Sequence, residues 1–179
     1  MHVREFRLIP FPAPKILALE ITGQVARQDN LLSIRYSVRG DVENIHLPVR
    51  SESPARKHDL WKATCFEFFL AVKDRPEYWE FNLSPSGHWN VYAMDAYRQV
   101  NMREEVAYSQ LPFEFTKMND ALSLDAAVNL SQLFQPLQTP QIGITAIIQT
   151  VDGMESYWAL DHPGAQADFH LRKSFVVEL

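Results

Sequence analysis

Three polar residues lie within strongly aromatic segments of the chain. Glu67 lies in the middle of an aromatic run, residues 64–70, and Glu80 and Asn82 share one face of the next predicted strand. A buried polar side chain needs a hydrogen-bonding partner. Each of the three is therefore either buried and bonded or turned to water across a concave sheet. The two carboxyls and the amide suit the recognition of hydroxyl groups, and ordinary outward positions on amphipathic strands are the alternative.

Two tryptophans near the ends of predicted strands add flat apolar surfaces to this polar set. Trp61 precedes Glu67 by six residues, and Trp158 lies in the run 156–160 near the other end of the chain. The apolar face of a pyranose ring stacks on an indole, while carboxylate and amide groups bond the hydroxyls. These residues predict a saccharide site, although tryptophans are also common core residues.

Alternating apolar and polar residues predict the strands that would position this site. The alternation is clear over 17–21, 32–39, 79–83 and 89–95, and the apolar run 64–72 indicates a buried strand. Further strands are expected over 45–49, 105–108, 114–117, 121–128, 142–150, 156–160 and 174–179. A short helix is expected only within 130–137, with Ser131 as its cap.

Short strands at regular spacing, without a long amphipathic helix, favour an all-β fold. Residues 84–88 have the Ser, Pro and Gly composition of a hairpin turn between two of the strands. No linker, repeat or low-complexity tract divides the chain. The sequence therefore predicts a single antiparallel β-sandwich, jelly-roll-like, over residues 1–179.

Three segments carry a more specific signal: residues 60–70, 78–87 and 157–163. Their most distinctive parts are W-x-x-T-C-F-E, from Trp61 to Glu67, and E-F-N-x-S-P-S-G, from Glu80 to Gly87. With these segments the chain resembles the DOMON-like group in the superfamily of family 9 carbohydrate-binding modules. The resemblance covers most of the chain and implies a β-sandwich that binds a sugar without transforming it.

The resemblance also assigns expected roles. In family 9 modules two tryptophans enclose a terminal sugar and polar residues on neighbouring strands bind its hydroxyls; by position these are Trp61 and Trp158, with Glu67, Glu80 and Asn82. Where an arginine is expected in the family, this chain has Glu80. Arg98, just after the strand 89–95, could add a charge-assisted bond to an acidic sugar or another carboxylate.

Other functions use the same or nearby residues. A glycoside hydrolase would use Glu67 and Glu80, since carboxyls on neighbouring strands can reach the separations of about 5 Å or about 6.5–9.5 Å that its two mechanisms need. A haem-binding DOMON module would take axial ligands from Met94, Met102, His88 or His162. A metal site could use Asp161, His162, Asp168 and His170. We expect neither a cofactor nor a metal.

Composition excludes several partners. Seventeen basic against 22 acidic residues give a net charge of −5, so nucleic acid and membrane surfaces are not expected partners. No two of the six glycines are separated by a single residue, which excludes a dinucleotide fingerprint and a P-loop. The one cysteine, Cys65, is expected to be a small buried hydrophobe, and a cytoplasmic location is predicted. The expected partner is a small molecule, most plausibly a saccharide.

Overall fold

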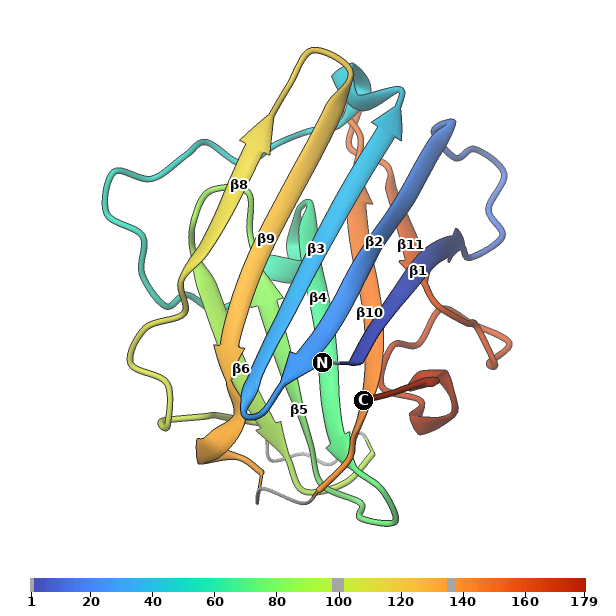
Figure 1. Cartoon of the computed structure of the whole chain (residues 1–179). Coiled ribbons are helices and arrows are strands. Elements are labelled where there is room, and N and C mark those ends of the chain that lie inside the picture. The colour runs from blue at the N-terminus through green and yellow to red at the C-terminus, as the bar shows by residue number, and fades with distance from the viewer. Residues whose placement is uncertain (1, 98–101, 135–137) are drawn as a thin grey trace.

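Strands form nearly all of the regular structure, as the alternating sequence predicts (Figure 1). The structure is a computed structural model that describes residues 2–97, 102–134 and 138–179. Its strands are β1 His2–Pro10, β2 Leu19–Gln28, β3 Leu31–Gly40, β4 Cys65–Val72, β5 Tyr78–Leu83, β6 Trp89–Met94, β7 Arg103–Glu104, β8 Phe113–Lys117, β9 Ala121–Asn129, β10 Pro140–Gln149, β11 Glu155–Ala159 and β12 Val177–Glu178. Its short 3-10 helices are η1 Val42–Asn44, η2 Leu60–Lys62, η3 Leu130–Gln132 and η4 Arg172–Ser174.

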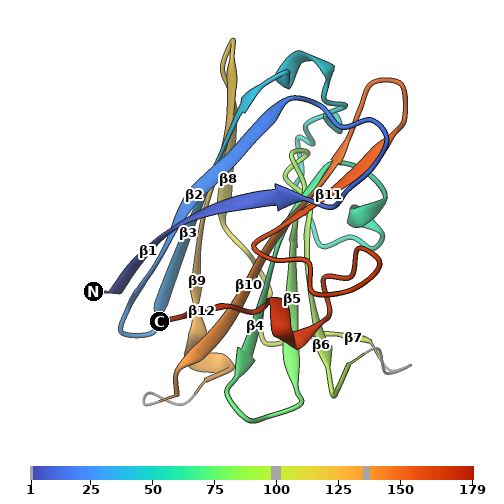
Figure 2. The ribbon, with the colours of Figure 1, turned by 90° about the vertical axis from the view of Figure 1, so that its right-hand side faces the viewer.

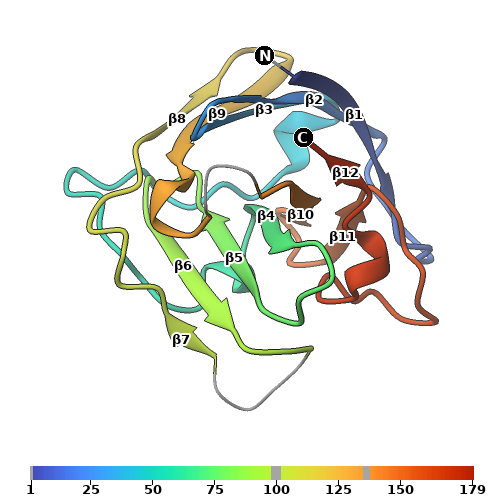
Figure 3. The same cartoon turned by 60° about the horizontal axis from the view of Figure 1, so that its bottom comes forward.

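The strands join into one curled antiparallel sheet. Its order is β7-β6-β5-β4-β10-β11-β1-β2-β3-β9-β8, with β12 paired to β10. The strand β1 makes the curl possible because it pairs with β2 up to Leu8 and then with β11 at Ile9 and Pro10. Figures 2 and 3 show the result: β2, β3, β8 and β9 lie across from β4, β5, β6 and β10.

The main core lies between these two halves of the sheet. Tyr36 of β3 packs against Phe66 of β4 with ring centroids 5.1 Å apart, and its hydroxyl donates to the carbonyl oxygen of Glu67 at 2.7 Å. Phe68 and Phe81 stack at 4.5 Å on neighbouring strands. Burying each such ring stabilises the fold by roughly 1.5–3 kcal/mol. The halves are therefore joined by apolar contact and by a hydrogen bond that crosses the core.

A second apolar cluster covers the outer face of β4 and β10. The segment before β12 brings Phe175 against Phe69 at 5.5 Å, and Phe169 belongs to the same cluster. Gly143 of β10 permits this approach, since a Cβ there would lie 2.7 Å from the Phe175 ring. As a result, β4 is buried on both faces.

Most predicted strands are confirmed, and the differences are at β1 and in the long connections before β4 and before β8. The strand β1 was not predicted, because its residues are largely exposed and precede a proline-rich stretch. The predicted strand 45–49 is wrong: after η1 only Ile45 forms an isolated bridge, to Thr150. The predicted strand 105–108 is also wrong, because the pairing with β6 involves only Arg103 and Glu104.

Two further boundaries differ near the ends of the core strands. The last strand is limited to Val177–Glu178, because η4 precedes it and occupies Arg172–Ser174. Within the described residues 130–134 the expected helix is the short η3, and the prediction of Ser131 as its cap is wrong, because the Asn129 side chain caps η3 by accepting from the Ser131 N–H at 3.0 Å. Residues 135–137 lie outside the described residues. No helix within the described ranges is long and apolar enough to cross a membrane.

Candidate functional site

The structure brings Glu67, Glu80 and Asn82 together on the outer face of the sheet. In the β4–β5 register Glu67 is opposite Asn82 and Phe69 is opposite Glu80, so all four side chains share one face. The Asn82 amide donates to Glu80 Oε1 at 2.8 Å. The two carboxyls are thus diagonal neighbours on adjacent strands, an arrangement that follows from the β4–β5 register.

Both carboxyls are buried, and one is incompletely bonded. Glu67 is 2% exposed and Glu80 is 5% exposed. Among the described residues, Glu67 Oε1 is the one buried side-chain oxygen or nitrogen without a hydrogen-bond partner. A buried polar atom left without a partner costs about 1–3 kcal/mol, and more for a charged group. An unpaired acceptor at this place is what a ligand with a donor group would satisfy.

Burial also changes the protonation of this pair. Burial raises the pKa of Glu67 well above its usual range, and the nearby charge of Glu80 raises it further, against the opposing effect of hydrogen bonding with the Cys65 thiol and the Thr145 hydroxyl. Burial raises the pKa of Glu80 to about 7, against the opposing effect of the hydrogen bond from Asn82. The pair therefore holds protons at a pH where an exposed glutamate has lost them.

A pocket of about 270 Å³ opens over the two carboxyls. This volume is near the lower end of the roughly 300–1,000 Å³ usual for small-molecule sites. The pocket is lined by Trp61, Glu67, Phe69, Glu80, Met102, Ile147, Tyr157, Ala167, Asp168, Phe169 and His170. The lining includes three carboxyl side chains and one imidazole, and among the described residues it includes neither lysine nor arginine.

Aromatic side chains form two sides of this pocket. Trp61 of η2 packs edge-on against Tyr92 of β6, with ring centroids 5.7 Å apart. Tyr157 extends from β11, where it is opposite Ile147 of β10. Since β5, β4 and β10 separate β6 from β11 in the sheet, Trp61 and Tyr157 flank the strands that carry the carboxyls.

The segment between β11 and η4 forms a third side. The His170 ring packs edge-on against Phe69 at 5.4 Å, and its Nδ1 lies 2.9 Å from the Tyr78 hydroxyl. Its Nε2 lies 3.9 Å from Glu80 Oε2. Asp168 accepts from the Tyr97 hydroxyl at 2.7 Å. These contacts fix the segment over the sheet and bring one more acid and one imidazole to the pocket.

Trp158 is not part of this pocket. It is 3% exposed and lies in the main core, where its indole N–H donates to Ser156 Oγ at 2.9 Å. The predicted pair of Trp61 and Trp158 across one ligand is therefore not formed. Neighbouring residues on a strand point to opposite faces, so the side chain that β11 presents to the pocket is Tyr157. The other predicted residue, Arg98, lies outside the described residues.

Two of the histidines weighed for metal or haem ligation have backbone partners elsewhere in the fold. His162 Nε2 lies 2.9 Å from the Ile9 carbonyl oxygen, and His88 Nδ1 accepts from the Ala55 N–H at 3.1 Å. No group of three or more His, Cys, Asp or Glu side chains within the described part of the chain could hold a metal ion. Cys65 is buried, as expected.

Eight of the lining residues were not assigned to the saccharide site from the sequence, among them Met102, Tyr157, Asp168 and His170. Tyr157 could have been recognised only from the register of β11, which the sequence does not give. Asp168 and His170 belong to a loop whose path depends on the packing of Phe169 and Phe175 on the sheet.

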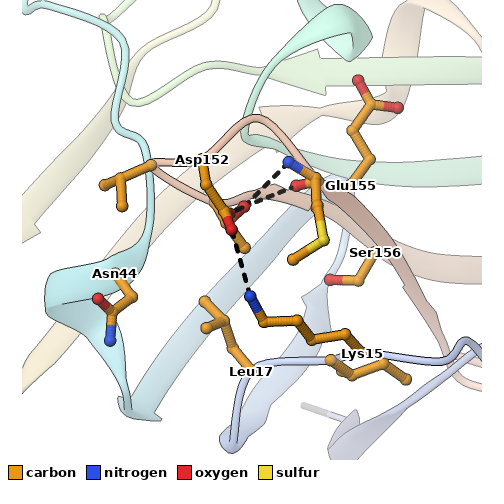
Figure 4. A pocket seen from close by; sticks show the side chains of 10 residues that line it. Lys15, Leu17, Asn44, Asp152, Glu155 and Ser156 are labelled. Carbon is orange, nitrogen blue, oxygen red and sulfur yellow. Dashed lines mark hydrogen bonds and ion pairs between the residues drawn. The ribbon is translucent and has the colours of Figure 1, made fainter.

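A second hollow, of about 280 Å³, has a different chemistry (Figure 4). It lies beside the β10–β11 turn, and its main charged groups, Lys15 and Asp152, form an ion pair at 3.2 Å. Both of these side chains are more than half exposed to solvent. This hollow has no buried unpaired polar atom among its described residues, so the pocket over Glu67 and Glu80 is the stronger candidate site.

Comparison with known proteins supports the fold. No protein-family model matches the chain, and no curated protein matches it. Among solved structures, the chain is similar to a candidate carbohydrate-binding protein from Bacteroides uniformis, with a TM-score of 0.67 and 12% identity over 96% of this chain and 84% of that chain.

The chain is also similar to a family 9 carbohydrate-binding module from Caldicellulosiruptor kristjanssonii. The structure in complex with cellotriose gives a TM-score of 0.53 and 12% identity over 90% of this chain and 75% of that chain. The structure in complex with glucose gives a TM-score of 0.50 and 11% identity over 84% of this chain and 72% of that chain. The chain therefore has an all-β fold like that of family 9 modules.

Proposed function

We propose that this protein binds a saccharide without transforming it, in the pocket between Trp61 and Tyr157. The observation that carries the proposal is Glu67 Oε1, a buried acceptor without a partner at the bottom of an aromatic-walled pocket. A sugar hydroxyl would supply the missing donor, and the aromatic rings would cover the apolar faces of the ring. Asn82 holds Glu80 in place and so acts as a positioning residue.

The structural neighbours support this proposal through the fold. Two of them are complexes of a family 9 module with cellotriose and with glucose. The finer assignment, a jelly-roll-like β-sandwich of the DOMON-like group, is part of the proposal and draws on the segments 60–70, 78–87 and 157–163. A single domain over residues 1–179 and a cytoplasmic location stay predictions.

A glycoside hydrolase is the competing proposal, because it would use the same two carboxyls. Such an enzyme needs one protonated and one ionised carboxyl, with pKa values that differ. Burial raises the pKa of both Glu67 and Glu80, so the direction of these shifts is compatible with either proposal, and a turnover assay separates the two. Turnover of chromogenic glycosides, abolished in Glu67→Gln, would replace the binding proposal with the enzymatic one.

Calorimetry with a panel of monosaccharides and disaccharides tests the binding proposal. Trp61→Ala and Tyr157→Ala should each weaken binding about tenfold, because each removes one stacking surface. Lys15→Ala, in the second hollow, is the matched control and should leave the affinity unchanged. Binding that is equally strong in the wild type and in both aromatic variants would refute the site, and no binding to any sugar would refute the function.

A further inference from the structure

We propose that the ligand carries a protonated amine, so that the pocket takes an amino sugar in preference to the neutral sugar of the same ring. This inference rests on the proposed saccharide function and specifies its substrate class. It follows from two carboxyls on one sheet face, an unpaired Glu67 Oε1 between aromatic walls, and a described lining without lysine or arginine.

The arrangement of carboxyls is better matched by an ammonium group than by a hydroxyl. A hydroxyl donates one hydrogen bond, whereas an ammonium group has three donors and a positive charge. Glu67 and Glu80 are diagonal neighbours, so one ammonium group placed over them can bond both. Its positive charge also stabilises the ionised forms of both carboxyls, which burial disfavours.

The walls of the pocket favour the same ligand. Trp61 and Tyr157 present aromatic rings on two sides of the carboxyls, and aromatic rings attract cations as well as sugar faces. Asp168 adds a third carboxyl on the side formed by the segment after β11. An anionic sugar would meet three carboxyl groups here, with His170 as the one basic group in the described lining.

Proton release is a consequence that binding of a neutral sugar would not share. Burial and mutual repulsion hold protons on the carboxyl pair, and an ammonium group would favour their ionised forms. The titratable groups that face or adjoin the pair are Tyr36 on β3, Cys65 on β4, Tyr78 on β5, Tyr92 on β6, Tyr157 on β11, and Asp168 and His170 on the following segment. Binding of an amino sugar should therefore release protons and weaken as the pH falls below about 7.

The experiment is calorimetry near neutral pH with glucosamine, galactosamine and mannosamine, each against its neutral parent sugar and its N-acetyl derivative. Cyclohexylamine serves as a six-membered ring with an amine and no hydroxyls. Titration in two buffers of different ionisation enthalpy measures proton release. We expect at least one amino sugar to bind about tenfold more tightly than both its neutral parent and its N-acetyl form, because a charge-assisted hydrogen bond replaces a neutral one.

Two variants connect the preference to the carboxyls. Glu67→Gln and Glu80→Gln keep the side-chain shape, so each should remove most of the amino-sugar preference and reduce proton release. In each variant the ratio of amino-sugar to neutral-sugar affinity should fall toward one, whatever the change in neutral-sugar binding itself. Glu114→Gln, on an exposed position of β8, is the matched control and should behave as the wild type.

The outcomes separate the two proposals. If the neutral sugars bind as tightly as the amino sugars or more tightly, the proposed saccharide function stands and the proposed preference for an amine is refuted. If cyclohexylamine binds as tightly as the amino sugars and the neutral sugars do not bind, the proposed recognition of an amine stands and the proposed saccharide function is refuted. Failure of all amino sugars and of cyclohexylamine to bind refutes the amine proposal, and an amino-sugar preference retained in both glutamine variants refutes its assignment to Glu67 and Glu80.

Discussion

The two faces of β4 are equally buried but differ in what their side chains contact. The inner face carries Phe66, Phe68 and Leu70, which meet the apolar side chains of the opposite half of the sheet. The outer face carries Glu67 and Phe69, covered by η2 and the segment before β12. Only the outer face leaves a buried polar atom without a partner among the described residues. Burial alone therefore does not separate core from site, whereas hydrogen-bond satisfaction does.

The largest effect on stability should come from Trp158 of β11, whose side chain lies on the same inner side of the sheet as Phe66 and Phe68. Trp158→Ala removes a fully packed indole and its hydrogen bond to Ser156 Oγ, and it should lower the free energy of unfolding by about 3–5 kcal/mol. Urea denaturation followed by fluorescence or circular dichroism measures this loss. A loss below about 1 kcal/mol would contradict the assignment of Trp158 to the core.

The outer face should make stability depend on pH. The folded-state pKa of Glu80 is about 7, against 4.5 ordinarily, so the folded protein binds more protons than the unfolded chain between these values. Proton binding by Glu80 therefore adds to the free energy of unfolding below about pH 4.5. This added stability is lost as the pH rises through about 7, and the loss is on the order of 3 kcal/mol. Glu67, whose pKa is also raised, acts in the same direction.

Denaturation curves at several pH values check this dependence. Glu80→Gln should be stabilised relative to the wild type, increasingly so as the pH rises from about 4.5 to about 7. Glu114→Gln, which is exposed, should show no such trend. Parallel pH profiles for the wild type and Glu80→Gln would show that Glu80 does not titrate in this range.

A smaller effect is expected at the hydrogen bond that connects the inner core to the site strand. Tyr36→Phe removes the donor to the Glu67 carbonyl oxygen and should cost about 1–2 kcal/mol, since this carbonyl is buried. Tyr157→Phe is the comparison on the outer face and should cost less, because the Tyr157 hydroxyl bonds the exposed Glu155. Equal costs for the two variants would contradict the difference between the faces.

The smallest stability effect is expected at the tryptophan of the pocket. Trp61 is half-buried at the edge of the outer cluster, so Trp61→Ala should cost about 1 kcal/mol or less while it weakens ligand binding. The pair Trp61→Ala and Trp158→Ala thus separates binding from stability in thermal denaturation and calorimetry. A Trp61 variant that fails to fold would place this residue with the core.

The sequence predicted the shared face of Glu80 and Asn82 because alternation along a strand is a local property, whereas the place of Glu67 on the same face depends on how β4 pairs with β5. It did not show that Trp158 points inward and Tyr157 outward, since this depends on how β11 pairs with β10. The curl of the sheet could not be predicted from the sequence either. It depends on the pairing of β1 with β11, which is distant in the sequence, and the residues of β1 are largely exposed and charged. Loop residues such as His170 reach the pocket only through tertiary packing.

The double pairing of β1 has a consequence for solubility. By bonding β2 along most of its length and β11 at its end, this strand covers an edge on each half of the sheet. Without it, the backbone N–H and C=O groups of β2 and β11 would be open to strands of other chains. Damage to the first ten residues should therefore appear as self-association of the protein before any change in the pocket is detectable.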